Sequence, residues 1–396
     1  MPILEKVHFE CKNSTVITRP SYEGRIRTAL GRSPVVMLVG PRQSGKSTLA
    51  RTVGRAGQYH FFDLEDPAAA ASLEQPMTAL QSLRGLVVLD EAQRQPALFP
   101  VLRVLADRPD APARFLVLGS ATPELSRQSA ESLAGRVEIV ELRGFDLGEI
   151  GRERSDALWV RGGFPRSFLA ATDDDSHRWR QDFLATFLER DLGVLGFGMA
   201  PAAMRRFWTM LSHYHGQIWN GAEIAAAMGV SPHTTRKYLD ALEQTFMVRV
   251  LQPWHDNLGK RLVKSPKIYL RDSGLFHALQ GIQAATQLQV HPKLGASWEG
   301  FVVEEVLREF QPHQAWFYAT HSGAELDLFF LHRGQRIGVE VKREDAPRLT
   351  KSMRVAQQDL RLDRLFVVYP GAQRYALADD VECVPLTTLG DLVVRA

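Results

Sequence analysis

The stretch "VVMLVGPRQSGKSTLARTVG", residues 35–54, decides the fold of the first part of the chain. An apolar, β-branched run ends at Val39, a loop with two glycines follows, and a helical pattern begins at Lys46. The loop "GPRQSGKS" fits the pattern G-x-x-x-x-G-K-[ST], in which backbone N–H groups surround phosphate oxygens. Because the motif needs a strand before it and a helix after it, these flanks predict a genuine P-loop rather than a Gly-rich turn.

Each residue type in this loop has a predicted task. The two glycines let the backbone curl, Lys46 reaches the β and γ phosphates, and Ser47 offers a hydroxyl to Mg²⁺. We therefore expect ATP and Mg²⁺ as cofactors. The predicted nucleotide-binding residues are Gly40, Pro41, Arg42, Gln43, Ser44, Gly45, Lys46, Ser47 and Thr48.

Three later segments supply candidate catalytic residues. The apolar run "LRGLVVLDEAQR" ends in Asp90, expected to hold Mg²⁺ through water, and Glu91, expected to polarise the attacking water. The run "RFLVLGSAT" ends in Ser120, which either senses the γ-phosphate or caps the next helix. Arg136 either neutralises phosphate charge, in its own site or a neighbour's, or is a surface arginine.

The pattern of elements predicts an α/β protein of four parts. Short apolar runs alternate with helical stretches in residues 1–150, which indicates an AAA+-like parallel-sheet P-loop domain. Residues 151–200 have helical periodicity with Gly-rich breaks and are interpreted as a helical lid or linker. Residues 201–275 are predicted to form a winged helix-turn-helix, and residues 276–396 a second α/β domain.

The winged helix-turn-helix prediction rests on "NGAEIAAAMGVSPHTTRKYLDALEQTFMVRVL", residues 220–251. Ser231 is the expected N-cap of the second helix, with Pro232 at its first position. Between residues 231 and 271, eight basic residues less three acids give +5, against +3 for the whole chain. This concentration favours nucleic acid as a partner, and the alternative is a packing module with a solvated basic loop. The basic residues are Arg236, Lys237, Arg249, Lys260, Arg261, Lys264, Lys267 and Arg271.

The stretch "GAELDLFFLHRGQRIGVEVK", residues 323–342, predicts a hairpin that carries Asp327, Glu340 and Lys342. A turn at Gly334 and Gln335 would place Asp327 opposite Lys342, with Glu340 on the same face. Two adjacent carboxylates suit Mg²⁺, and the lysine could orient water for attack on a phosphodiester. The alternative is a solubilising edge hairpin with charged tips.

A helical segment upstream of this hairpin, "SWEGFVVEEVL", residues 297–307, offers further acids. One of Glu299, Glu304 and Glu305 could complete the metal shell of the hairpin carboxylates.

Bulk features set the expected location. The 396 residues contain two distant cysteines, Cys11 and Cys383, which argues for a reducing compartment and against a zinc site. The first residues carry charges and no apolar signal segment, and no run approaches a membrane span. We therefore expect a cytoplasmic protein without membrane contact.

Taken in order, these motifs resemble a prokaryotic family of AAA+-type ATPases with an N-terminal AAA domain and a C-terminal DUF4143 domain. The matching segments run from "GPRQSGKST" through "RGGFPR" and "SPKIYLRDSGL" to "ELDLFF…GVEVK". The resemblance implies a PD-(D/E)xK nuclease-like, restriction-endonuclease-like fold at the C-terminus. Its site residues here would be Asp327, Glu340 and Lys342, with Glu304 as the helix acid; Leu326 stands where that superfamily has proline.

The leading hypothesis is an ATP-hydrolysing protein that binds and processes duplex or branched DNA, with Mg²⁺-dependent cleavage as an open question. A homo-oligomer formed through the ATPase domain is also expected. The first alternative is an ATP-switched DNA- or protein-binding regulator whose nuclease-like domain is catalytically silent. The second is a protein-remodelling ATPase that uses the winged helix as an adaptor.

Overall fold

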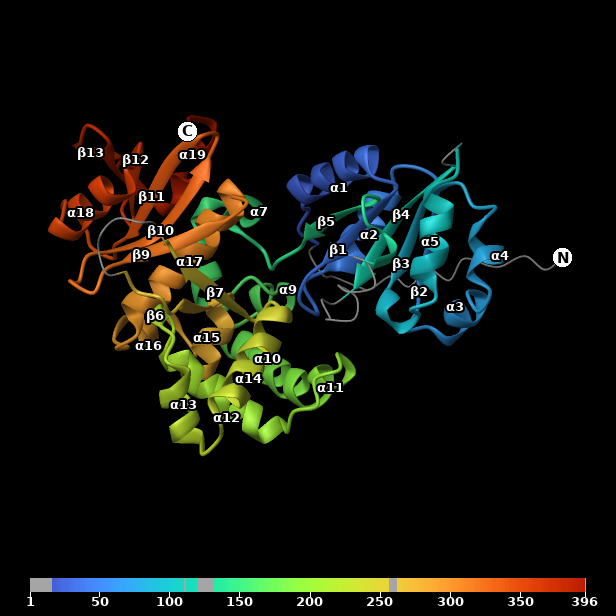
Figure 1. Cartoon of the computed structure of the whole chain (residues 1–396), viewed down its shortest axis with the longest axis horizontal. Helices are drawn as coiled ribbons and strands as arrows, with labels where there is room; N and C mark the ends of the chain where they lie inside the picture. Colours follow the sequence, from blue (N-terminus) through green and yellow to red (C-terminus); the bar gives the residue numbers. More distant parts are fainter. Residues whose placement is uncertain (1–15, 110–111, 120–130, 256–261, 396) are drawn as a thin grey trace.

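The computed structural model describes residues 16–109, 112–119, 131–255 and 262–395. The chain forms two lobes: a P-loop lobe and a larger lobe built from everything that follows it (Figure 1). Ser120, Lys260 and Arg261, all singled out in the sequence, lie outside the described residues. None of the helices in the described ranges has the length and apolar character that crossing a bilayer requires.

The P-loop lobe is a five-stranded parallel sheet in the order β2-β3-β4-β1-β5. Its strands are β1 (Val35–Val39), β2 (Tyr59–Asp63), β3 (Gly85–Asp90), β4 (Ala113–Gly119) and β5 (Val137–Glu141). Its helices are α1 (Pro20–Arg32), α2 (Lys46–Gly54), α3 (Pro67–Ser72), α4 (Pro76–Leu80), the 3₁₀ turn η1 (Ala92–Arg94) and α5 (Leu98–Ala106). The predicted α/β P-loop fold is confirmed.

Burial on both faces explains why these strands are continuously apolar. Along β1, Val36 and Leu38 pack against α1 and α2, whereas Val35 and Met37 pack against α4 and α5. A sheet covered by helices on both faces needs apolar side chains at every position. The polar residues of the motifs are therefore confined to the loops at the strand ends.

Residues 142–213 connect the lobes and are helical, but they are not a separate lid. The elements are α7 (Leu147–Ile150), η2 (Arg152–Arg154), α8 (Ser155–Arg161), α9 (Pro165–Phe168), α10 (Asp173–Thr186), the π-helical turn η3 (Phe187–Asp191), α11 (Leu192–Val194) and α12 (Pro201–His213). Phe183 and Phe187 share one buried core with Trp208 and Leu242 of the next unit, and Trp159 belongs to the C-terminal core. The predicted boundary at residue 200 therefore does not separate independent cores. The cores do change between Leu142 and Phe145, close to the boundary predicted at residue 150.

A helix–turn–helix unit follows, made of α13 (Gly221–Met228) and α14 (Pro232–Gln244). Ser231 caps α14 by accepting a hydrogen bond from the Thr234 N–H, with Pro232 at the first helical position, as predicted. Strands β7 (Val248–Pro253) and β8 (Lys267–Leu270) then pair antiparallel, and the short β6 (Gln217–Ile218) pairs with β8. The assignment of this unit as a winged helix remains a prediction.

These strands continue into the C-terminal sheet, because β7 pairs parallel with β9. The resulting nine-stranded sheet has the order β13-β14-β12-β11-β10-β9-β7-β8-β6. The predicted boundary at residue 275 therefore falls inside one structural body. Its remaining strands are β9 (Ala315–Ala319), β10 (Glu325–His332), β11 (Gln335–Val341), β12 (Arg364–Tyr369), β13 (Tyr375–Ala378) and β14 (Val381–Pro385). The helices are α15 (Ser273–Leu279), α16 (Ala285–Gln289), α17 (Leu294–Phe310), α18 (Lys351–Leu360), η4 (Leu386–Thr388) and α19 (Gly390–Arg395).

Helix α17 is the central element of this body and packs against β10, β11 and β12, whereas α18 covers their other face. Gly300 lets α17 approach the buried His215 closely, since a Cβ there would lie 2.1 Å from Nε2 of that histidine. The Nδ1 of His215 in turn accepts a hydrogen bond from the Leu270 N–H at 2.9 Å. The helix is thus fixed against both the hairpin and the helix–turn–helix unit.

The predicted hairpin exists, but its register differs by two residues from the expectation. His332 pairs with Gln335, so the turn residues are Arg333 and Gly334. Extending this register from the Leu328–Val339 pair places Asp327 opposite Glu340 rather than opposite Lys342. Because side chains alternate with a period of two, the slip keeps Asp327 and Glu340 on the same face.

Candidate functional site

The P-loop lies at the carboxyl ends of the parallel strands, between β1 and α2. Gly40 and Gly45 have φ values of 157° and 92°. A Cβ on Gly40 would lie 2.0 Å from the Leu142 carbonyl oxygen, so no other residue fits there. The Ser44 hydroxyl is buried without a hydrogen-bond partner, which is the state expected of a loop shaped to receive an anion.

Lys46 is buried and donates hydrogen bonds from Nζ to the carbonyls of Gly40 at 3.0 Å and Pro41 at 2.8 Å. Burial lowers the pKa of Lys46 to about 8, against the opposing attraction of Glu91 and Asp90. An ammonium held by two carbonyls in a buried loop is positioned to transfer its hydrogen bonds to phosphate oxygens.

Two acids from the end of β3 face this lysine. Asp90 is buried, and its pKa is raised by burial, opposed by a hydrogen bond from Ser47 and increased further by Asp63. Burial also raises the pKa of Glu91, which has a left-handed backbone (φ 54°) and a hydrogen bond from Gln93. The Ser47 hydroxyl and the Asp90 carboxylate form an oxygen pair of the kind Mg²⁺ binds, so these residues fit the ion.

Asp63 is a residue that the sequence analysis missed. It ends β2 and stands in register with Asp90 on the neighbouring β3. The signal was present, because "HFFDLED" is an apolar run that ends in an acid just as "LVVLDE" does. Asp63 adds a second carboxylate to the edge that would hold the metal.

Arginines also surround the loop. Arg42, within the P-loop, forms an ion pair with the buried Asp191 of the π-helical turn η3. Arg19, also buried, donates to the Ser44 carbonyl at 3.2 Å, to the Gly144 carbonyl at 3.1 Å and to Glu149. These contacts tie the P-loop backbone to residues outside the P-loop sheet.

Arg136 lies at the opposite edge, directly before β5, and its carbonyl accepts a hydrogen bond from the N–H of Val35 at the start of β1. Its guanidinium pairs with Asp107 at 2.6 Å, and this pair is exposed. Its predicted role in the chain's own nucleotide site is therefore wrong, because the P-loop lies at the other end of the strands. A role in a neighbour's site would require a second copy of the chain.

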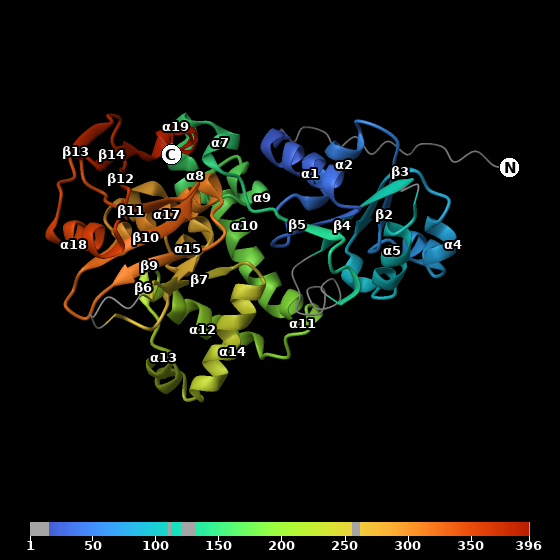
Figure 2. The same cartoon turned by 45° about the horizontal axis from the view of Figure 1, so that its top comes forward.

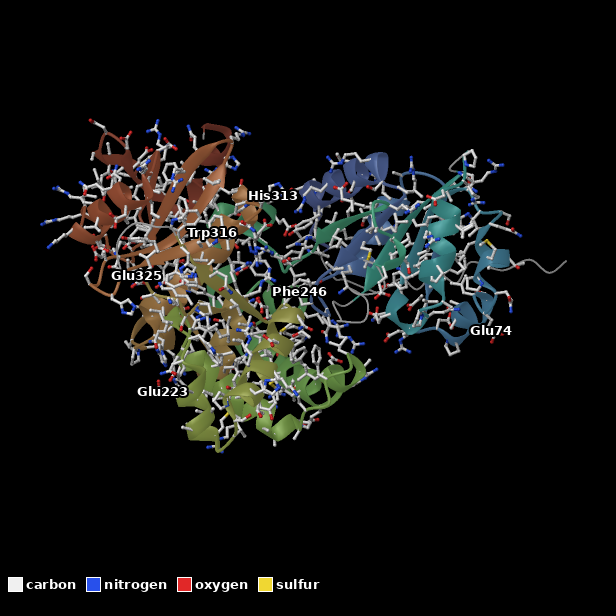
Figure 3. The ribbon with its side chains drawn as sticks, in the orientation of Figure 1. Glu74, Glu223, Phe246, His313, Trp316 and Glu325 are labelled. Atoms are coloured by element: carbon white, nitrogen blue, oxygen red, sulfur yellow. The ribbon has the colours of Figure 1, made fainter. Side chains whose placement is uncertain are left out.

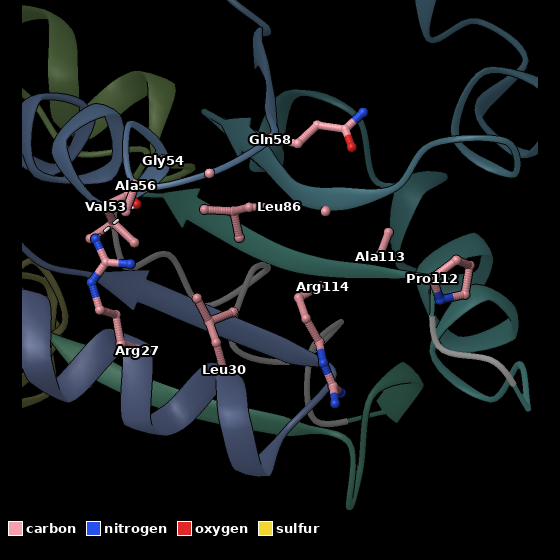
Figure 4. Close-up of a pocket in the computed structure, with 12 residues that line it drawn as sticks. Arg27, Leu30, Val53, Gly54, Ala56, Gln58, Leu86, Pro112, Ala113 and Arg114 are labelled. Carbon is pink, nitrogen blue, oxygen red and sulfur yellow. Dashed lines mark hydrogen bonds between the residues drawn. The ribbon is translucent and has the colours of Figure 1, made fainter.

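A cavity of about 270 Å³ opens at that same amino edge, lined by residues that include Arg27, Leu30, Gln58, Leu86 and Arg114 (Figure 4). It contains none of the predicted site residues. The nucleotide chemistry is therefore assigned to the carboxyl edge, where the P-loop and both acids meet.

On the second lobe, Glu304 of α17 is not in the nuclease-like site as predicted. It is buried in what we call the Glu304 cluster, with Arg143 at 3.3 Å, Arg249 at 2.9 Å and Arg271 at 3.5 Å from Oε2. Burial by itself would raise the pKa of Glu304, but Arg249, Arg271 and Arg143 hold it well below its usual range. The third helix glutamate, Glu305, accepts a hydrogen bond from the Leu147 N–H at 3.0 Å.

The helix acid near the hairpin is Glu299, which the sequence offered as an alternative. Five residues turn a helix by about 140° relative to its starting direction, so Glu299 and Glu304 point to different sides of α17. Glu299 joins Glu325, Asp327 and Glu340 in what we call the acidic cluster. Tyr269 donates a hydrogen bond to Glu299 at 2.6 Å.

Two lysines, Lys267 and Lys342, contact the carboxylates of this cluster. Lys267 lies 3.2 Å from Glu299 and 3.4 Å from Asp327, and also pairs with Glu325. The Nζ of Lys342 lies 2.6 Å from Glu340, in agreement with the prediction that these two residues share one face of the hairpin. Within the described residues no three acids, histidines or cysteines are arranged to hold a metal ion. The predicted Mg²⁺ at Asp327, Glu340 and Glu304 therefore does not fit this arrangement.

Comparison with known proteins agrees with the two lobes. Residues 32–151 match the family described as an AAA domain, residues 152–286 the domain of unknown function DUF8612, and residues 294–389 the domain of unknown function DUF4143. "Uncharacterized protein Rv2008c" of Mycobacterium tuberculosis and "Uncharacterized protein Mb2031c" of Mycobacterium bovis are each 52% identical over 93% of this chain and 84% of their own length. The chain belongs to this family, which joins an N-terminal AAA domain of the P-loop ATPase type to a C-terminal DUF4143 domain.

Solved structures are more distant. A Walker-type ATPase of Pyrococcus abyssi aligns with a TM-score of 0.47 and 15% identity, over 67% of this chain and 96% of that one. The RuvB Holliday junction branch migration motor of Thermotoga maritima gives a TM-score of 0.30 and 20% identity, over 59% of this chain and 90% of its own. Neither likeness is close enough to bear on the function of this chain.

The acidic cluster predicts a pH dependence of stability. Burial, with Asp327 nearby, raises the pKa of Glu340 to about 8, opposed by Lys342. An unfolded glutamate titrates near pH ~4.3, so between about pH 4.5 and 8 the folded state holds a proton that the unfolded state has lost. The free energy of unfolding therefore falls as pH rises through this range, by at most about 1.4 kcal/mol per pH unit for one proton.

Glu340→Gln, which mimics the protonated acid, should make this decline shallower in thermal melts from pH 5.5 to 9. Glu74→Gln is the control, because Glu74 is exposed on the P-loop lobe, far from the cluster (Figure 3). Parallel profiles for wild type and Glu340→Gln would show that Glu340 carries no such proton.

Proposed function

We propose that the protein hydrolyses ATP at its P-loop and that the bound nucleotide controls a DNA-binding surface on the second lobe. The observation that carries the ATPase part is the convergence of Lys46, Ser47, Asp90 and Glu91 at one strand edge. The observation that supports nucleotide control is the set of ion pairs between the P-loop surroundings and the second lobe.

In the hydrolytic step each group has a role that its present contacts support. The Nζ of Lys46 would exchange the Gly40 and Pro41 carbonyls for phosphate oxygens. Ser47 and Asp90 would hold Mg²⁺, which neutralises phosphate charge when bound. Glu91, which interacts with Lys46 from the end of β3, would orient the attacking water and accept its proton.

Control of the second lobe would begin at two contacts of the P-loop. Arg42 pairs with Asp191 of η3, so a phosphate that attracts Arg42 competes with this pair. Pro41 lines a cavity of about 20 Å³ together with Arg271 and Glu304, next to the Glu304 cluster. Figures 1 and 2 both show β5 and α1 as the elements of the P-loop lobe that face the second lobe.

The DNA-binding part is supported by the start of α14, where His233, Arg236 and Lys237 are exposed. The count of +5 for residues 231–271 overstates the surface charge, however. Arg249, Lys267 and Arg271 are held in ion pairs with buried or partly buried acids and do not offer free charge to a phosphate backbone. The proposed footprint is therefore smaller than the sequence indicated and centres on the second helix of the pair.

Lys46→Ala should reduce ATP hydrolysis to background, because it removes the ammonium group that the P-loop carbonyls hold in place for the phosphates. Glu91→Gln should bind ATP with near wild-type affinity but turn it over at least about a hundredfold more slowly, the range expected for loss of a general base. Both are measured by phosphate release and by binding of a fluorescent ATP analogue. Wild-type hydrolysis by Lys46→Ala would contradict the assignment of the site.

Replacing Arg236 and Lys237 together by alanine should weaken duplex binding and reduce the dependence of log K on log salt by about 0.9 per lost phosphate contact. Arg32→Ala, which removes an exposed arginine from the P-loop lobe, is the matched control and should leave the slope unchanged. Fluorescence anisotropy over 50–300 mM salt measures the slope. An unchanged slope in the double variant would favour a protein partner for this helix pair.

A further inference from the structure

Lys267 is an unusual member of its strand. It stands at the start of β8, where every residue of "KIYL" is buried, and the lysine itself is only 3% exposed. A buried lysine needs a compensating negative charge. Its strand belongs to the helix–turn–helix unit, yet its Nζ reaches into the acidic cluster of the C-terminal sheet and α17.

The Nζ of Lys267 contacts carboxylates from two different elements. It lies 3.2 Å from Glu299 Oε1 of α17 and 3.4 Å from Asp327 Oδ1 of β10, and pairs with Glu325 of the same strand. A divalent ion shared by Glu299 and Asp327 would need the space between these oxygens. The ammonium already bridges that space with a charge of the same sign.

Other hydrogen bonds occupy most of the remaining carboxylate oxygens of the cluster. Asp327 Oδ2 accepts the Val341 N–H at 2.9 Å, and Tyr269 donates to Glu299 at 2.6 Å. Lys342 binds Glu340 Oε1 at 2.6 Å. Among the described carboxylate oxygens of this cluster, Oε2 of Glu340 is the one that is buried without a hydrogen-bond partner.

A proton on Glu340 lowers the cost of leaving that oxygen without a partner, because a neutral carboxyl group is less costly to bury than a carboxylate. Burial and the nearby Asp327 raise the pKa of Glu340 to about 8, so the group is neutral at pH 7. Burial would lower the pKa of Lys267, but Tyr269, Glu299, Asp327 and Glu325 hold it well above its usual value. Two ammonium groups and a retained proton thus offset three of the four carboxyl groups.

We propose that Lys267 is the resident cation of this site, standing where a nuclease-like fold would hold a divalent metal, so that the site is closed to Mg²⁺ and Mn²⁺ in the native protein. The C-terminal lobe then folds and binds its partners without metal. The inference does not depend on ATP hydrolysis, because it concerns cation binding on the other lobe.

The test is Mn²⁺ binding to the full chain without nucleotide, followed by the electron paramagnetic resonance signal of free Mn²⁺. Wild type and Asp327→Asn should bind the same amount of Mn²⁺, so that any background binding at the P-loop cancels. Lys267→Met, which keeps most of the length of the side chain and removes its charge, should gain one site. That site should be at least about tenfold tighter than any background, since a +1 charge in contact with its ligands has been removed. Lys267→Met/Asp327→Asn should lose the site again.

Two results would overturn the proposal. The first is a wild-type site for Mn²⁺ that Asp327→Asn abolishes, and this measurement needs no lysine variant. The second is a folded Lys267→Met that gains no site. Lys267→Arg, which keeps a cation, is the folding control and should bind Mn²⁺ no better than wild type. Should Lys267→Met not fold, the wild-type and Asp327→Asn comparison decides alone.

Discussion

The buried carboxylate of Glu304 is the contact on which the arrangement of the two lobes depends. It is 2% exposed and is bound by arginines from three separate segments: Arg143 after β5, Arg249 on β7 and Arg271 after β8. Glu141, at the end of β5, pairs with Arg271 and Arg143, and these two arginines lower its pKa to about 2 against the opposing effect of burial. Removing one partner of such a buried pair typically costs about 3–5 kcal/mol. These ion pairs therefore connect the end of the P-loop sheet to the helix–turn–helix unit and to α17.

Because Glu304 lies on α17, this helix connects the arginines beside the P-loop lobe with the acidic cluster. One side of the helix presents Glu304 to the arginines beside the P-loop lobe, and another presents Glu299 to Lys267 and Tyr269. A single helix of 17 residues therefore carries both sets of contacts. A displacement of the arginines when nucleotide binds would reach the acidic cluster through a single element, without a long chain of intermediate contacts.

The sequence predicted local features well because they depend on neighbouring residues. The P-loop strand and helix, the cap at Ser231 and the presence of the hairpin all follow from such signals. It failed where the outcome depends on residues far apart in the chain. Arg136 is next to a strand, but only the sheet shows that it stands at the wrong end. Lys267 looked like a surface cation among other basic residues, and its partners Glu299 and Asp327 are 32 and 60 residues away. The choice between Glu299 and Glu304 required the rotation of α17 to be known.

Nucleotide bound at the P-loop should alter the second lobe through Glu304 and α17. Amide hydrogen exchange of the Glu91→Gln variant, measured with and without Mg²⁺–ATP, tests this coupling, because the variant is expected to retain ATP. If this coupling exists, ATP should change protection in residues 294–310 and 325–341. Adding Glu304→Gln should remove this change while the change around residues 40–48 persists. Protection that changes only within residues 32–151 when ATP binds would contradict it.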